Sequence, residues 1–186
     1  ASGAGKIVGG LVFSLGLMLV IVLGADLFTS TTMTLIPRAS RRITWGQMFA
    51  NWGVVYAGNF VGSLILVALI LLSGHPWENG GSIALFYINT TEHKLTHTFI
   101  EALFLGVMCN LMVCLGVWMS YAGRSLFDKM IACLFPVGLF IACGFEHSVA
   151  NMFMIPIGIL CSNMMPPELA AKLADPAHIA SVPNWQ

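Results

Sequence analysis

The chain has 186 residues, of which 58% are hydrophobic and only 9% are charged. Soluble domains carry about 25% charged residues, and a soluble core built by a chain of this length does not hide so much apolar surface. The formal net charge is zero, which leaves no basic surface for nucleic acid, so the composition predicts a membrane protein.

Four apolar blocks follow one another along the chain, at 7–37, 46–73, 96–121 and 130–165. The second and third fit the roughly 20 residues that a helix needs to cross the apolar core of a bilayer. The first and last are too long for one straight span, and each carries acidic and polar residues near its middle. We therefore predict interrupted helices in both, although length alone leaves open a hairpin of two short spans in the last block.

The two interrupted blocks share two motifs in the same order. The motifs are Gly24-x-Asp26 and Met33-Thr-Leu-Ile-Pro37 in the first block, and Gly144-x-Glu146 and Met152-Phe-Met-Ile-Pro156 in the last. The acid and the proline are eleven residues apart in the first block and ten in the last. Such a match indicates an internal repeat. Three membrane crossings between the copies would invert the second one, which predicts inverted repeats with broken helices that face each other at the midplane.

The basic residues predict the orientation of the spans. The separators at 38–42 and 123–129 contain five of them: Arg38, Arg41, Arg42, Arg124 and Lys129. The opposite side contains only three: Lys6, Lys94 and Lys172. The positive-inside rule places the first group in the cytoplasm, and the segments 74–95 and 166–186 then lie outside. A hairpin in the last block would instead leave 166–186 inside, and the few charges of this tail do not decide between the two.

The cysteines and the N-terminus carry no sign of chemistry or targeting. All five cysteines lie in apolar runs without metal-ligand or redox spacing, and we expect them to be small packing residues: Cys109, Cys114, Cys133, Cys143 and Cys161. No signal peptide and no initiator methionine precede the first apolar block, so we expect the sequence to be a piece of a longer chain.

Ionisable residues inside apolar blocks are costly and mark functional sites by default. His147 lies in the middle of the last block, and we favour a role in a pore over one as a packing residue. Asp26 and Glu146 occupy equivalent repeat positions, where a carboxylate can hold unpaired N–H groups of a broken helix. Glu101 lies four residues after His97, which predicts a pair between them.

Three further polar motifs allow more than one interpretation. The run Thr29–Thr32 is suited to cap a restarted half-helix, whose free N–H groups would also attract an anion. Lys94 is either a solvated end charge or a lure for anions. The motif Glu92-His93-x3-His97 has the spacing of metal ligands on a helix, but no further ligands are evident and we predict no metal site.

Large apolar side chains flank both interruptions, namely Phe13, Leu17, Leu27, Phe28 and Phe140. Periodicity alone does not distinguish a gate from packing or lipid contact at these positions.

Several segments resemble the formate/nitrite transporter family, and within it most closely the bacterial formate channels. They are Ala25–Ser30, Gly144–Met152, and the stretch from His97–Glu101 through Asn110–Val113 to Gly123–Ser125. The resemblance covers residues 1 to about 165 and is weak across 74–91 and the tail.

The resemblance implies an all-α polytopic membrane protein with an aquaporin-like bundle of six membrane segments, of which the second and fifth are broken. It implies that block four is one broken span and that this chain covers segments two to five, without the first and sixth. We therefore expect one transmembrane domain fragment over 1–186, with 166–186 as an extracytoplasmic tail.

The resemblance also implies roles for individual residues. Thr29 and His147 would lie in the breaks of the second and fifth segments, with His147 facing the pore centre, and Lys94 would attract anions. The hydrophobic constrictions would include Phe13, Leu17, Leu27 and Phe140, and Asn110 and Val113 would line the same path. Asp26 stands where the family pattern leads us to expect glutamate, and the acid is retained.

The expected function is permeation of formate or a similar small anion through homopentamers in the bacterial inner membrane, without a cofactor. Half-helix N-termini, the Thr29 hydroxyl and the His147 imidazole are three devices that lower the cost of an anion in a low dielectric. Alternatives are a nitrite or hydrosulfide channel and a proton-coupled secondary transporter. An intramembrane hydrolase is disfavoured, because Ser148 directly follows His147 and no nucleophile elbow is present.

Overall fold

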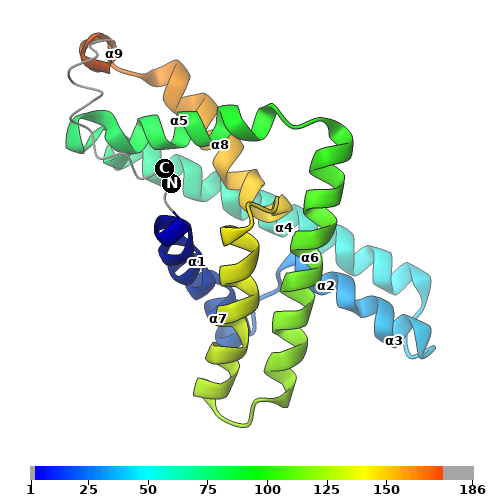
Figure 1. The fold of residues 1–186 in the computed structure, drawn as a ribbon. Coiled ribbons are helices and arrows are strands. Elements are labelled where there is room, and N and C mark those ends of the chain that lie inside the picture. Colours follow the sequence, from blue (N-terminus) through cyan, green and yellow to red (C-terminus); the bar gives the residue numbers. More distant parts are fainter. Residues whose placement is uncertain (1–2, 174–186) are drawn as a thin grey trace.

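The computed structural model describes residues 3–173, and these residues form helices joined by short turns (Figure 1). In chain order the α-helices are α1 (Gly3–Leu23), α2 (Phe28–Thr31), α3 (Leu35–Ala39), α4 (Trp45–Leu72), α5 (Ser82–Leu95), α6 (Phe99–Ala122), α7 (Leu126–Ala142), α8 (Ser148–Met164) and α9 (Pro167–Leu173). The 3-10 turns are η1 (Thr32–Thr34), η2 (His75–Trp77) and η3 (Asn79–Gly81).

The helices α1, α4 and α6 are long and apolar enough to cross a membrane. Their outer faces expose large apolar side chains, with Phe104 on α6 62% and Leu69 on α4 59% accessible. Such surfaces are stable against lipid or other apolar helices and not against water. The molecule is therefore a membrane protein.

The two predicted interruptions are confirmed as breaks between half-helices. The first separates α1 from α2 at residues 24–27, and the second separates α7 from α8 at residues 143–147. Gly24 and Gly144 adopt positive φ angles of 69° and 72°, which favour glycine. The same backbone hydrogen bond closes both helices, from Ala25 N to Val20 O (2.9 Å) and from Phe145 N to Phe140 O (3.0 Å).

After each break the chain becomes helical again four residues after the glycine, at Phe28 and at Ser148. Leu27 and His147 precede the restarts with nearly equal extended angles, φ −111° and ψ 124° for Leu27 and φ −105° and ψ 113° for His147. The first restart then passes through the 3-10 turn η1, whereas α8 continues as an α-helix through Pro156. The one-residue difference in the acid-to-proline spacing falls in this stretch.

Two apolar clusters hold the helices together. The first lies between α1, α6 and α7 and contains Leu17, Cys109, Val113, Val117, Cys133, Val137 and Phe140. The second lies between α4, α5 and α8 and contains Val67, Ala84, Ile157 and Cys161. In Figure 1, α1 and α7 run beside each other, as do α5 and α8. Each break thus joins a half-helix of the first cluster to a half-helix outside it.

The segment 74–95, expected from the sequence to be an external loop, contains the helix α5. Its Ala84, Tyr87 and Ile88 pack into the second cluster, and Thr91 donates a hydrogen bond to the Met154 carbonyl oxygen at 2.8 Å. The segment is therefore a packing element of α8. The expected external tail begins with α9, and its residues 174–186 lie outside the described range.

Three of the five cysteines, Cys109, Cys133 and Cys161, are buried packing residues as expected, whereas Cys143 is exposed at the second break. Glycines serve the same purpose between α1 and α7. A Cβ atom on Gly10 would lie 2.7 Å from the carbonyl oxygen of Gly138, so the two backbones touch at this crossing.

Candidate functional site

Thr29 and His147 meet between the two half-helices, although 118 residues separate them in the sequence. The Thr29 Oγ1 and His147 Nε2 atoms are 3.3 Å apart. Both residues are buried, with 4% and 7% of their surfaces accessible. The breaks bring them together, because each residue lies at or next to the start of a half-helix.

His147 is itself the N-cap of α8. Its Nδ1 atom accepts a hydrogen bond from the backbone N–H of Ala150 at 3.0 Å. An Nδ1 atom that accepts carries no proton, so the neutral ring has its proton on Nε2. The Nε2–H group therefore points to Thr29 as a donor, and the Thr29 hydroxyl retains its own proton for a further acceptor.

Aromatic rings surround the Thr29–His147 contact. The Phe140 ring stacks on the His147 ring at 5.7 Å between centroids, and Phe13 meets both rings edge-on, at 5.9 Å from Phe140 and 6.4 Å from His147. The first apolar cluster includes Leu17 and Val113, and Leu27 packs against it. Phe28 instead packs edge-on against Tyr56 of α4 at 5.0 Å.

Two polar side chains of α6 form hydrogen bonds with α2 and the turn η1. Asn110 Nδ2 donates to Thr32 Oγ1 at 3.1 Å. The Cys114 thiol donates to the carbonyl oxygen of Thr29 at 3.6 Å. These contacts fix the backbone that carries the Thr29 hydroxyl.

A groove of about 370 Å³ opens onto these residues. Its polar lining comes from both half-helices and α6, and includes Thr29, Thr32, Asn110, Glu146, His147 and Ser148. Phe28 and Cys109 contribute to its apolar lining. The groove thus places hydroxyl, amide and imidazole donors around one small space.

An ion cluster supports the second break. The Glu146 Oε2 atom accepts from Lys94 Nζ at 2.6 Å and from Asn151 Nδ2 at 2.8 Å. His97 Nε2 lies 3.7 Å from Glu146 Oε1. Lys94 and Glu146 keep only 17% and 11% of their side chains accessible, so Lys94 is engaged within the protein.

The first break is held by a neutral side chain from α4. Asn59 Oδ1 accepts from the backbone N–H of Phe28 at 2.8 Å, and Asn59 Nδ2 donates to the carbonyl oxygen of Asp26 at 3.0 Å. Within residues 3–173 the Asp26 carboxylate makes no hydrogen bond. Asp26 thus contributes its backbone to the break, whereas Glu146 contributes its carboxylate.

Two sequence-based predictions near the breaks are wrong. Thr29–Thr32 does not cap the restarted half-helix, because the chain is already helical from Phe28 and Asn59 caps it instead. Glu101 does not pair with His97 but accepts hydrogen bonds from the N-cap residue Thr98, at 2.8 Å to both its backbone N and its hydroxyl. This capping box engages the Glu101 carboxylate, and His97 lies 3.7 Å from the Glu146 carboxylate instead.

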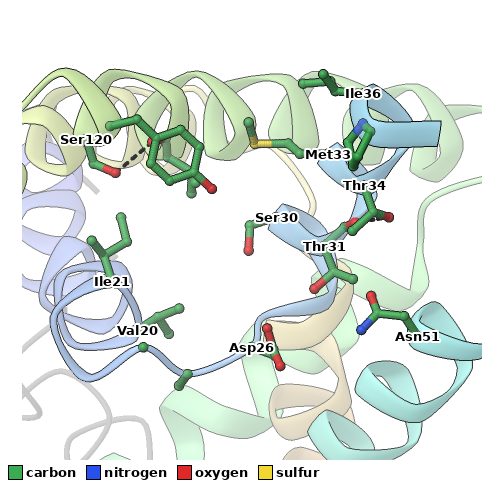
Figure 2. A pocket seen from close by; sticks show the side chains of 15 residues that line it. Val20, Ile21, Asp26, Ser30, Thr31, Met33, Thr34, Ile36, Asn51 and Ser120 are labelled. Atoms are coloured by element: carbon green, nitrogen blue, oxygen red, sulfur yellow. Dashed lines mark hydrogen bonds between the residues drawn. The ribbon is translucent and has the colours of Figure 1, made fainter. Parts of the chain in front are cut away.

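A second hollow of about 550 Å³ lies on the opposite side of α2. Figure 2 shows Asp26, Ser30 and Thr31 along this hollow, between Ile21 of α1 on one side and Asn51 of α4 on the other. The short helix α2 therefore separates two spaces, and Thr29 faces the one that contains His147.

Comparison with known proteins identifies the family. A family model described as formate/nitrite transporter matches residues 1–180. The chain belongs to the formate/nitrite transporter family.

Relatives in the formate/nitrite transporter family include two formate channels named FocA. The chain is 55% identical over 166 residues to FocA of Escherichia coli K12, a match that covers 89% of this chain and 58% of that protein. It is 50% identical over 181 residues to FocA of Haemophilus influenzae, which covers 97% of this chain and 64% of the relative. The chain thus spans about three fifths of the length of these relatives.

Solved structures of formate/nitrite transporter proteins have the same fold. A pentameric formate channel with formate bound superposes with a TM-score of 0.88 at 42% identity, covering all of this chain and 72% of that one. An ion channel of the family superposes with a TM-score of 0.74 at 28% identity, covering 98% and 76%.

Three supporting residues at this formate/nitrite transporter site were missed by the sequence analysis: Asn59, Cys114 and Asn151. Each is a polar or polarisable residue within an apolar helix. Polar side chains in spans join helices by hydrogen bonds, so an asparagine near the middle of the apolar block 46–73 was the available signal for Asn59.

Proposed function

We propose that the protein contributes the pathway of a channel that conducts formate across the bacterial inner membrane as a homopentamer. The observation that carries this proposal is the Thr29–His147 contact at the meeting point of two half-helices. The FocA relatives are named formate channels, and the structure at 42% identity is described as pentameric with formate bound.

The groove offers a small carboxylate the donors that it loses on leaving water. A bare anion in a low-dielectric site is costly unless it is hydrogen-bonded. The Thr29 hydroxyl, the His147 imidazole and the Asn110 amide border one space, where each would donate a hydrogen bond to such an anion. In this proposal the polar site is the central anion-binding site of the pathway.

The apolar side chains around this binding site would form the constrictions that narrow the pathway. Phe13 and Phe140 lie against His147, and Phe28 lines the groove. Leu17, Leu27 and Val113 would narrow the path within the first apolar cluster. Such walls keep water and larger ions out, which strengthens each hydrogen bond inside.

Two charged groups would act at the edge of the site. Lys94 would draw anions toward the outer side, in competition with the Glu146 carboxylate that it already binds. Asp26 and Glu146 would support the loops rather than contact the anion. This assignment makes the protein a transport protein without a cofactor and not an enzyme.

Two other assignments use the same geometry. A nitrite or hydrosulfide channel needs the same donors, and a proton-coupled transporter would share the inverted repeats. The rates at which formate, nitrite and hydrosulfide enter proteoliposomes distinguish a formate channel from a nitrite or hydrosulfide channel. Saturation of the flux together with a fixed proton stoichiometry would identify coupled transport instead.

The decisive variant is His147→Asn, with His75→Asn at an exposed turn as its matched control. Asparagine is a good N-cap, so α8 should still begin at the same residue, but the titratable ring is lost. Between about pH 5 and pH 8, which brackets the pKa of free histidine, formate flux in the variant should persist but lose its steep pH response. An unchanged pH profile at equal incorporation would remove His147 from any proton-linked role.

A further inference from the structure

The turn between α3 and α4 forms a basic hollow that the proposed pathway does not use. Its volume is about 350 Å³, and its lining includes Arg38, Arg41, Arg42, Thr44, Trp45 and Gln47. The hollow lies at the end of α4 that the positive-inside rule assigns to the cytoplasm. Three arginines thus line one small concave surface.

Within the described part of the chain, no carboxylate forms an ion pair with these arginines. The ion pairs within residues 3–173 involve only Glu146, with Lys94 and His97. The Arg38 guanidinium instead lies over the Trp45 ring, 4.5 Å from its centroid, and its Nε–H is buried without a hydrogen-bond acceptor. A buried donor without an acceptor is costly, and an anion beside the Arg38 guanidinium would offset part of this cost.

The backbone of the hollow also favours an anion. The helix α4 has 28 residues and begins at Trp45, where Thr44 and Gln47 form a capping box. The capping box satisfies the Gln47 N–H, whereas the amide groups of Trp45 and Gly46 have no acceptor within the helix, and the positive end of the helix dipole lies at the hollow. Arg41 holds a left-handed conformation with φ 57°, which an L side chain adopts only at a cost.

The aromatic side chains beside the hollow indicate where the anion comes from. Trp45 and Phe49 stack at 5.9 Å between centroids and remain 50% and 57% exposed. Tryptophan at the end of an apolar span marks the headgroup level of the bilayer. An anion at this depth is therefore part of the lipid surface.

We propose that the hollow binds the phosphate group of an anionic phospholipid. The arginines provide the bidentate donors that phosphate favours, and the acyl chains would lie along the exposed apolar face of α4 that starts at Trp45 and Phe49. The lipid would thereby anchor the turn that connects the first half-helix to α4.

The test compares retention of phosphatidylglycerol and phosphatidylcholine by the purified protein, measured by native mass spectrometry. The variant Arg41→Gly removes one guanidinium and relieves the left-handed strain, so it should fold as well as the parent or better. We expect it to bind phosphatidylglycerol about fivefold more weakly, and Arg41→Gly with Arg42→Gln more weakly still, while phosphatidylcholine binding stays the same. Arg124→Gln removes an exposed charge from the other basic separator and should change neither.

Two outcomes would overturn the proposal. Equal losses for Arg124→Gln and Arg41→Gly would reduce the effect to general surface charge. Displacement of phosphatidylglycerol by inorganic phosphate, added to the same samples against chloride of equal ionic strength, would make the hollow a site for a soluble anion instead. The melting temperature of each variant in neutral detergent, measured alongside, separates lost binding from lost folding.

Discussion

The breaks after α1 and after α7 share one backbone geometry and are stabilised by different side chains. Gly24 and Gly144 have the same left-handed angle, and Leu27 and His147 the same extended one. The first break relies on the neutral side chain of Asn59, from a different helix. The second break relies on His147, which is the N-cap of α8, and on a buried cluster of charges around Glu146.

Because of this difference, the buried charges of the site lie at the second break only. A hydrogen bond from a neutral amide contributes about 1 kcal/mol and depends little on salt or pH. A buried carboxylate with a lysine partner is far more sensitive to the loss of either group. The two halves should therefore respond very differently to equivalent substitutions.

The largest difference is expected between Glu146→Gln and Asp26→Asn. The first leaves Lys94 without its carboxylate in a mostly buried position and should lower stability by about 3 kcal/mol. The second changes an exposed carboxylate without a hydrogen bond and should stay within about 0.5 kcal/mol. Thermal unfolding in detergent measures both, and equal losses would contradict the assignment of charge to one break.

A smaller effect is expected from Asn59→Leu. The change leaves the Phe28 N–H and the Asp26 carbonyl oxygen without partners, which should cost about 2 kcal/mol. The control Asn51→Leu makes the same change two turns earlier on α4, at an exposed position. If the two variants melt at the same temperature, Asn59 does not hold the first break.

The smallest effect tests what the two breaks share. Gly24→Ala and Gly144→Ala should each cost about 1 kcal/mol, because alanine tolerates a positive φ poorly. No atom lies within 4 Å of the added methyl group at either position, so the two costs should be equal. Gly58→Ala in the interior of α4 is the control and should be neutral or stabilising. Unequal costs at the two breaks would argue against an equivalent backbone.

The sequence predicted the breaks because glycine, acid and proline recur in order in two overlong apolar blocks. That the two breaks lie next to each other was predicted only from the inverted symmetry of the repeat. The cap of α2 is Asn59 rather than Thr29–Thr32 because of how α4 packs, and no local sequence pattern encodes that packing. Two misses had readable signals. Thr98-x-x-Glu101 is a capping box, and Ala84, Tyr87, Ile88 and Thr91 follow the helical spacing of α5.

The Gly10–Gly138 crossing has a consequence for the proposed channel that reaches beyond packing. One turn along α1 from this crossing is Phe13, and half a turn along α7 is Phe140, so backbone contact fixes how far apart the two rings can stand. A single methyl group at Gly10 would push the two helices apart and separate the two rings, which are now in edge-to-face contact. In the proposed channel, the width of the pathway would thus depend partly on a residue that does not itself contact the anion.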